Sequence, residues 1–212
     1  MILVEYNGLR IEWLGHASFR LMGKHVVYID PFQLKGENQK ADLVLITHSH
    51  HDHLSLGDIH KIMAQQTWLV GPVDAPSKLG KLGSDVKFHM LKPGESLNHN
   101  NIKIMGFPAY NLNKPFHPKA NGWLGYLIEM EGVKVFHAGD TDAIPELKTL
   151  KDIDILMLPI GGTYTMTAEE AAALANTIMP KVAIPMHYGG IVGTAADGDK
   201  FKRLARCAVG NI

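Results

Sequence analysis

Residues 43–53 read Leu-Val-Leu-Ile-Thr-His-Ser-His-His-Asp-His, an apolar run followed by the pattern His-x-His-x-Asp-His. The apolar run predicts a short buried strand. Side chains alternate along an extended segment, so His48 and His50 can point the same way and bind one metal ion. Asp52 and His53 follow where the turn begins and can reach a second ion. This stretch therefore predicts a two-metal site at the end of a strand.

The residue types in this stretch also bear on which metal would bind. Four of the chain's 12 histidines lie in it, and the single Cys207 is far away near the C-terminus. Imidazole and carboxylate donors suit zinc, manganese or iron better than an ion that prefers thiolates. We expect one or two divalent ions per chain, with zinc preferred over manganese or iron. The alternative is an exposed histidine-rich loop, which would require the aspartate, the strand and the matching residues elsewhere to coincide by chance.

Several other apolar runs also end in an acid or a histidine. These endings are Gly15-His16, Asp30-Pro31, Ala138-Gly139-Asp140 and Met186-His187. Loops that leave a rigid sheet commonly carry the functional groups of a protein. We therefore expect these residues to converge with residues 48–53 on a single site.

Strand patterns and helical patterns are interspersed along the chain. The predicted strands are residues 9–13, 18–22, 25–29, 43–46, 102–107, 123–130, 133–136, 153–158 and 182–185. The predicted helices are residues 56–65 after a Ser55 cap, 75–82, 168–179 and 199–208. Thr167 and Glu170 form the T-x-x-E capping pattern at the start of the third helix, and Pro180 ends it. Residues 111–121 are rich in proline and asparagine and predict a surface loop.

The composition limits the class of protein. At 212 residues and 46% hydrophobic content, residues 1–212 fit one domain. The 21 basic and 21 acidic residues cancel, which favours a small-molecule substrate over nucleic acid or an anionic membrane. No stretch of the sequence is apolar enough to span a bilayer, and Glu5 interrupts the N-terminal apolar run. Together with the single cysteine, this predicts a cytoplasmic protein, and assembly into a homo-oligomer stays open.

An ordered set of short strings resembles the metallo-β-lactamase superfamily. The strings are Trp13-Leu-Gly-His16-Ala-Ser18, Ile29-Asp30-Pro31-Phe32, the 48–53 motif, His137-Ala-Gly-Asp140-Thr141, Leu158-Pro-Ile-Gly-Gly162 with Thr165-Met166, and Pro185-Met-His187-Tyr-Gly189. The chain is similar to the branch with phosphorylated-ascorbate lactonases, N-acyl-phosphatidylethanolamine phospholipase D and other metal-dependent hydrolases. The resemblance implies an α+β fold, an αββα sandwich of two similar halves. Two mixed β-sheets would be flanked by helices, with the metals at the rim between the sheets.

The resemblance also implies a ligand set. The first metal would be bound by His48 and His50, the second by Asp52, His53 and His187, and Asp140 would bridge both ions. Two of these residues have structural alternatives. Asp140 could be a turn former after Gly139. His187 could be a core histidine at a strand end.

Four further residues are candidates for the surroundings of the metals. Asp30 would orient a ligand imidazole from outside the ligand set. His16 would line the site or contact substrate, with a purely structural role as the alternative. Tyr164 and Thr165, beside Gly161-Gly162, could line the substrate pocket or donate a proton, with packing and loop shaping as the alternative.

One position departs from the family pattern. Most members place a third histidine for the first metal after the strand that here ends in residues 107–111, and this chain has Tyr110 where that imidazole is expected. His117 in the following loop is the nearby replacement, with an exposed loop histidine as the alternative. If His117 is not a ligand, we expect an enzyme that uses one ion.

The resemblance implies a metal-dependent hydrolase, in which a metal-activated water attacks a small ester, lactone or phosphodiester-type substrate. Asp52 is the expected catalytic residue, since it can bind metal and orient or deprotonate the attacking water. The alternatives are a redox metalloenzyme on the same fold, a metal-dependent nuclease and a non-catalytic binding domain. The zero net charge weighs against a nuclease, and the intact motif weighs against a binding domain.

Overall fold

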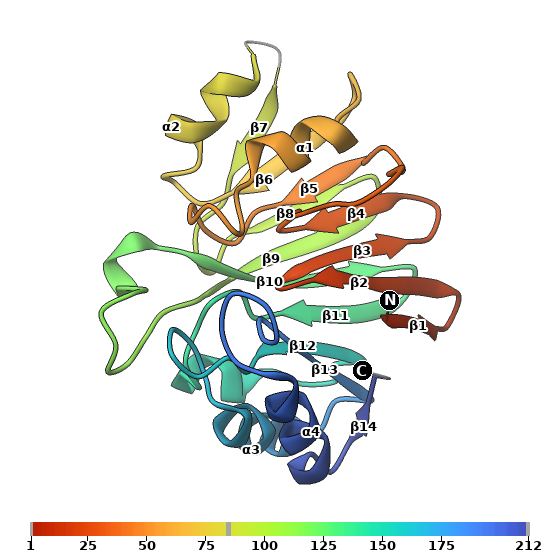
Figure 1. Ribbon diagram of the computed structural model, residues 1–212. Coiled ribbons are helices and arrows are strands. Elements are labelled where there is room, and N and C mark those ends of the chain that lie inside the picture. The colour runs from red at the N-terminus through yellow and green to blue at the C-terminus, as the bar shows by residue number, and fades with distance from the viewer. Residues whose placement is uncertain (1, 84–85, 211–212) are drawn as a thin grey trace.

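The computed structural model describes residues 2–83 and 86–210, and these form two seven-stranded β-sheets (Figure 1). The first sheet contains, in spatial order, β1 (Ile2–Tyr6), β2 (Leu9–Gly15), β3 (Ser18–Met22), β4 (Val26–Ile29), β5 (Leu43–Leu45), β6 (Trp68–Gly71) and β7 (Lys87–Met90). The second contains β8 (Ser96–His99), β9 (Ile102–Pro108), β10 (Leu124–Met130), β11 (Val133–His137), β12 (Ile155–Pro159), β13 (Val182–Met186) and β14 (Ala208–Val209).

The two sheets repeat one topology. In each, the first four strands pair antiparallel with their sequence neighbours, and the last three add on in parallel. Three hairpins use two-residue loops, Asn7-Gly8, Asn100-Asn101 and Glu131-Gly132, in which both residues have positive φ. This is the type I′ turn, whose twist matches that of the strands and therefore fixes their register. Both sheets are mixed, as the family resemblance implied.

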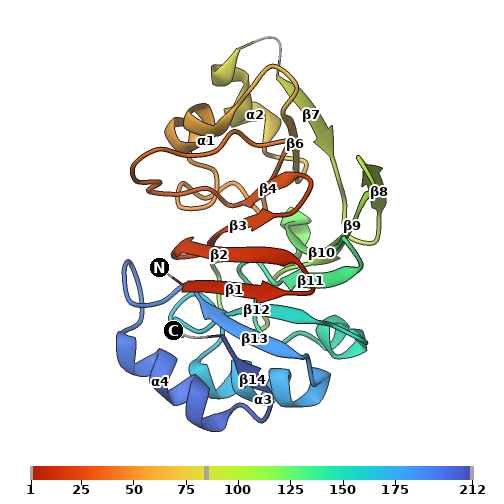
Figure 2. The same cartoon turned by 90° about the vertical axis from the view of Figure 1, so that its right-hand side faces the viewer.

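Helices cover the outer faces of the sandwich. Figure 1 and Figure 2 show α1 (Leu56–Ile62) and α2 (Pro76–Leu79) beside the first sheet, and α3 (Ala168–Ile178) and α4 (Ala195–Leu204) beside the second. Three short 3₁₀ helices are η1 (Gly80–Leu82), η2 (Lys119–Asn121) and η3 (Pro145–Thr149). Ser55 caps α1, and Thr167 and Glu170 cap α3 with the reciprocal hydrogen bonds that the sequence pattern predicts.

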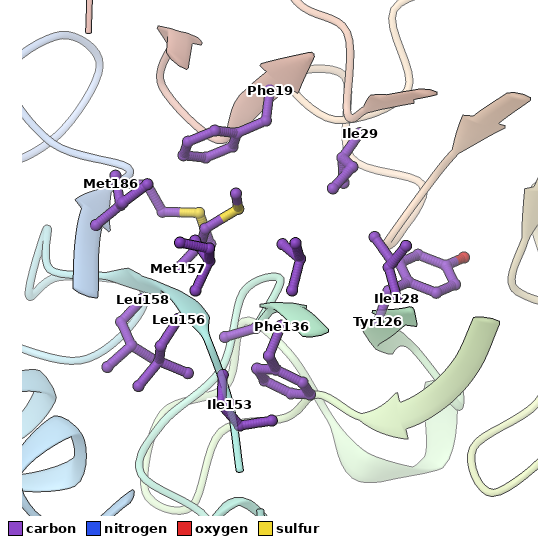
Figure 3. Close-up of a cluster of buried hydrophobic side chains, with 14 of the residues drawn as sticks. Phe19, Ile29, Tyr126, Ile128, Phe136, Ile153, Leu156, Met157, Leu158 and Met186 are labelled. Carbon is purple, nitrogen blue, oxygen red and sulfur yellow. The ribbon is translucent and has the colours of Figure 1, made fainter. Parts of the chain in front are cut away.

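Alternation along the central strands shows why the layers form. In β4, Val27 and Ile29 belong to the core shared by the two sheets, whereas Val26 and Tyr28 pack in the separate cluster that includes α1. Figure 3 shows the shared core, where Phe19 and Ile29 of the first sheet point toward side chains of the second such as Met157. Burying each such side chain contributes about 1.5–3 kcal/mol, so the sandwich forms a rigid frame for the loops at its rim.

The predicted fold class is confirmed, and all nine predicted strands are present with ends that shift by at most two residues. The strands β1, β6, β7, β8 and β14 were not predicted. β7 and β8 are short and alternate weakly, so their pairing with neighbouring strands determines their structure.

One helix prediction was wrong. We placed the last helix at residues 199–208, but α4 spans Ala195–Leu204 and Ala208 begins a strand. Its start is set by Thr194, whose backbone N–H donates to Asp197 Oδ2 at 2.7 Å as part of a capping box. Helix α1 also ends at Ile62, three residues before its predicted end.

The prediction of one domain over residues 1–212 includes residues 1, 84–85 and 211–212, which lie outside the described residues. Within the described part of the chain, no helix combines the length and apolar character needed to cross a membrane.

Candidate metal centre

Most of the predicted site residues follow β2, β4, β5, β11 and β13 along one rim of the sandwich, whereas His117 lies between β9 and β10, and Tyr164 and Thr165 lie between β12 and α3. Their donor atoms form three groups, each with all atoms within 4.8 Å of one another: His48, His50 and His117; His48, His53 and Asp140; and His16, Asp52, His53 and His187. His48 and His53 belong to two groups each, so the three groups form one continuous centre. The convergence that the strand ends predicted is therefore present.

The rim is held together by hydrogen bonds between the two sheets. Leu124 N–H donates to the Thr47 carbonyl at 3.0 Å, and the Tyr126 hydroxyl donates to the Ile46 carbonyl at 2.6 Å. Gly139 allows this approach, since a Cβ there would lie 2.5 Å from the Leu124 carbonyl oxygen. Its φ of +63° is also left-handed, which favours glycine.

Three site residues have strained backbones. His16, Asp30 and His187 have φ values of +51°, +46° and +58°, which are unfavourable for residues with a side chain. Such a conformation costs about 1–3 kcal/mol and persists only where the surroundings impose it. Here His187 N–H donates to the His16 carbonyl at 2.9 Å, and the Trp13 indole donates to the same carbonyl at 2.8 Å. The scaffold therefore dictates where these imidazoles point.

His117 lies in the loop between β9 and β10, yet its side chain is only 1% exposed. Its Nε2 lies 3.2 Å from Asp140 Oδ2, and its ring centroid is 5.2 Å from those of both His48 and His50. The structure therefore brings His117 to the centre, as the departure at Tyr110 led us to expect. Tyr110 points elsewhere, because its hydroxyl lies 3.0 Å and 3.1 Å from the two carboxylate oxygens of Glu146.

Asn111 determines how the His117 ring is presented. The Asn111 side-chain oxygen accepts hydrogen bonds from the His117 backbone N–H and from Nδ1, both at 3.0 Å. The Asn111 amide nitrogen donates to Asp142 Oδ1 at 3.1 Å and to the Tyr164 carbonyl at 2.9 Å, which fixes the orientation of the amide. The proton of His117 therefore resides on Nδ1, and the Nε2 lone pair faces the centre.

Trp123 forms a wall against the three histidines of this group. Its ring centroids lie 4.9 Å from His48, 4.8 Å from His50 and 5.6 Å from His117. The indole N–H donates to Asp74 Oδ2 at 2.9 Å, and Ser49 Oγ donates to the same oxygen at 2.6 Å.

Sequence reasoning missed Asn111, Asp74 and Trp123. Asp74 is 25 residues from Ser49 and 49 from Trp123, so no local pattern indicates that they meet. For Asn111, the sequence offers only its position at the start of the Pro-rich loop.

Around Asp52 and Asp140 the carboxylates and imidazoles alternate. His16 Nε2 lies 2.9 Å from Asp52 Oδ2, and His187 Nε2 lies 3.1 Å from Asp140 Oδ2. His53 Nε2 lies between the two acids, 3.5 Å from Asp52 Oδ2 and 3.4 Å from Asp140 Oδ1. Asp140 also approaches His117, so it links the two sides of the centre.

Asp30 lies behind His53 and is fully buried. His53 Nδ1 donates to Asp30 Oδ2 at 2.7 Å, and Thr47 donates to Asp30 through its backbone N–H at 2.8 Å and its hydroxyl at 2.6 Å. Asp30 thus keeps the His53 proton on Nδ1 and leaves Nε2 toward the centre. This is the arrangement by which outer carboxylates orient metal-binding imidazoles.

Burial and neighbouring charges shift the pKa values strongly. Burial raises the pKa of Asp140, but the charges of His187 and His53 outweigh it and hold that pKa well below its ordinary value. Burial lowers the pKa of His187, but Asp140 and Asp52 raise it to about 9. For Asp52, the effect of burial is outweighed by contacts with His16 and His187, so its pKa also lies below the ordinary range.

Several buried donor atoms at the centre have no hydrogen-bond partner among the described residues. They include His53 Nε2, His117 Nε2, His187 Nε2 and Asp140 Oδ1. Leaving a buried polar atom unpaired costs about 1–3 kcal/mol, and here four such atoms face a common space. Nitrogen and oxygen donors in this number suit zinc and related divalent ions. The residues present therefore fit the metals that the sequence pattern implied.

A cavity of about 250 Å³ opens above the centre. Six of its lining residues are histidines and aspartates of the 48–53 motif and its partners, and the other three are Phe116, Tyr164 and Ile191. Tyr164 thus lies where a substrate contact was predicted. Thr165 is fully buried and is not part of the cavity wall.

Residues 10–187 match the family described as the Beta-lactamase superfamily domain. A UPF0173 metal-dependent hydrolase from Thermococcus onnurineus is 34% identical over 209 residues, which cover 92% of this chain and 92% of the relative. The chain belongs to the β-lactamase superfamily, among the UPF0173 metal-dependent hydrolases. Like those relatives, it is a metal-dependent hydrolase.

Two solved structures share this fold. The crystal structure of a protein described as a metal-dependent hydrolase from Parabacteroides distasonis has a TM-score of 0.82 at 34% identity, covering 95% of this chain and 92% of that one. The diiron β-hydroxylase CmlA from Streptomyces venezuelae has a TM-score of 0.74 at 15% identity, covering 95% of this chain and 52% of that one. CmlA thus shares the metallo-β-lactamase fold.

Proposed function

We propose that this protein hydrolyses a small ester, lactone or phosphodiester with a water molecule activated at the centre described above. One observation carries the proposal. Two groups of imidazoles meet at Asp140, and both contain buried donor atoms that have no hydrogen-bond partner among the described residues. We assign His48, His50 and His117 to one ion and Asp52, His53 and His187 to the other, with Asp140 between them. A bound divalent ion supplies Lewis acidity and lowers the pKa of its water toward neutrality.

Asp52 is the residue that we assign to the attacking water. Contacts with His16 and His187 keep its pKa low, so the carboxylate is ionised throughout the neutral range. A strongly ionised carboxylate accepts a hydrogen bond well but stores a proton poorly. Asp52 therefore orients the water, and His16 positions Asp52 from behind through their 2.9 Å contact.

Iron-dependent oxidation is the second candidate function. The donor set consists of imidazoles and carboxylates, which suit iron as well as zinc. CmlA, a diiron β-hydroxylase of the same fold, is an example of such chemistry. Elemental analysis together with a visible spectrum after aerobic purification separates the two candidates, since zinc is colourless and a diiron centre absorbs.

The proposal is tested with protein reconstituted with zinc, manganese or iron and assayed on chromogenic esters, lactones and phosphodiesters. We expect hydrolysis of at least one class, lost in His187→Ala together with bound metal. His60→Ala is the matched control, because His60 is an exposed histidine on α1. Metal-loaded protein that hydrolyses no member of the panel would overturn the proposal.

A further inference from the structure

Asp74 lies beside the histidine motif because of the way β5 and β6 pair. The two strands are parallel, with Leu45 opposite Val70, so both leave the sheet at the same edge. β5 leads into residues 48–53, and β6 leads into the loop before α2, where Asp74 lies. Ser77 Oγ donates to the Asp74 carbonyl at 2.7 Å, which holds the backbone of this loop. Asp74 is therefore close to the metal centre, although it belongs to none of the three donor groups.

One carboxylate oxygen of Asp74 accepts two hydrogen bonds from residues that surround the imidazoles. Ser49 Oγ donates to Asp74 Oδ2 at 2.6 Å, and the Trp123 indole N–H donates to the same oxygen at 2.9 Å. Both donors are buried, since Ser49 is 8% exposed and Trp123 is 6% exposed. A buried donor without an acceptor is costly, so the carboxylate determines where both side chains lie.

Ser49 connects Asp74 to the backbone that carries two of the imidazoles. It lies between His48 and His50, whose ring centroids are 4.7 Å apart. Lys78 donates to the Ser49 carbonyl, so Ser49 is bound through its carbonyl as well as its hydroxyl. A segment that is held at two points has few alternative conformations, and the directions of both imidazoles depend on it.

Trp123 connects Asp74 to the third imidazole of the group. Its ring centroid is 5.6 Å from that of His117, in addition to its contacts with His48 and His50. The hydrogen bond to Asp74 favours one orientation of the indole, and the indole in that orientation limits how far the neighbouring imidazoles can turn.

We propose that Asp74 is a positioning residue for the ion assigned to His48, His50 and His117, here called the first ion. The inference rests on that assignment and not on the identity of the substrate. Asp74 acts through the hydrogen bonds from Ser49 and Trp123, so its contribution is an acceptor oxygen. Removing a residue that orients metal ligands typically lowers metal affinity by about 10–100-fold.

The test is a zinc titration of chelator-stripped protein against a chromogenic competitor, which measures the affinity for each ion. Asp74→Ala should lower the affinity for the first ion by about 10–100-fold. The affinity for the other ion, assigned to Asp52, His53 and His187, should stay at the wild-type value. Asp199→Ala is the matched control, because Asp199 is an exposed aspartate on α4.

Asp74→Asn separates the hydrogen bonds from the charge. Its amide oxygen has two lone pairs and can accept from both Ser49 and Trp123. Its amide nitrogen would replace Asp74 Oδ1, which has no hydrogen-bond partner among the described residues, so no existing bond is broken. We therefore expect Asp74→Asn to restore the wild-type affinity for the first ion.

Ser49→Ala and Trp123→Phe each remove one donor to Asp74 and should each cause part of the loss. In the Asp74→Ala background, Ser49→Ala should add no further loss, because the bond between the two side chains is already absent. Ser49→Ala also carries the test if Asp74→Ala does not fold, since the bond from Trp123 to Asp74 remains in that variant.

Wild-type affinity for the first ion in Asp74→Ala, equal weakening of both ions, or no restoration in Asp74→Asn would overturn the inference and leave the proposed hydrolysis standing. Metal-loaded protein that hydrolyses no substrate would overturn the proposed function alone, because the measurement here is metal binding. A wild type that binds no zinc would overturn both.

Discussion

Asn111→Ala tests whether Asn111 positions His117 as a metal ligand. The substitution removes the acceptor of two hydrogen bonds from His117 and the donor of two others, to Asp142 and the Tyr164 carbonyl. At about 0.5–1.5 kcal/mol for each of the four bonds, we expect a loss of about 2–6 kcal/mol in the free energy of unfolding. The His117 proton would no longer be held on Nδ1. Mutating a residue that orients a metal ligand typically lowers metal affinity by about 10–100-fold, and we expect a decrease in this range.

The assay is a zinc titration of chelator-stripped protein in the presence of a chromogenic competitor, combined with urea unfolding. Only the ion assigned to His48, His50 and His117 should weaken. Asn113→Ala is the matched control, since Asn113 is an exposed asparagine in the same loop. If Asn111→Ala folds and binds both ions as the wild type does, Asn111 does not position His117 and the assignment of that ligand is wrong.

Three further predictions follow from the centre and its frame. Asp52→Asn, reconstituted to wild-type metal content, should lose about 10²–10⁴ in kcat, and near-normal turnover would show that another group orients the water. In the metal-free protein the pKa of His187 is about 9, so the ring is protonated at pH 7. Metal must displace this proton, so zinc affinity should rise with pH until about pH 9, with proton release measurable by calorimetry in two buffers; a pH-independent affinity would contradict this. Gly139→Ala should destabilise by about 2–4 kcal/mol in urea unfolding, through the clash with Leu124 and the left-handed φ. Gly132→Ala, with positive φ and open space around it, should lose only about 1 kcal/mol; equal losses would show that the close contact at Gly139 contributes nothing.

The sequence predicted the parts of the fold that local chemistry specifies. The strand at residues 43–46 and the capping box at Thr167 depend on neighbours within a few positions, and both are confirmed. The last helix starts four residues earlier than predicted, because Thr194 and Asp197 form a capping box at its N-terminus. Short strands such as β8 form through pairing with a partner strand, which single-sequence periodicity does not reveal.

At the metal centre, too, the sequence predicted what local patterns specify and not what tertiary contacts determine. Polar residues that follow apolar strands could be expected to converge, and the structure brings His48, Asp140 and His187 together. His117 could be chosen only because Tyr110 occupied the expected place. Asn111 holds the His117 ring through a side-chain hydrogen bond from six residues away. Asp74 bonds to Ser49 and Trp123 over separations of 25 and 49 residues. Such contacts follow from tertiary packing, so no motif predicted them.

The most direct test of the central claim is the number of zinc ions bound per chain after stripping, reconstitution and desalting. The two donor groups joined by Asp140 predict two ions in the wild type and in His60→Ala. They predict loss of one ion in His117→Ala and loss of the other in His187→Ala. A wild type that takes up no metal, or uptake that His117→Ala and His187→Ala both leave unchanged, would contradict the account.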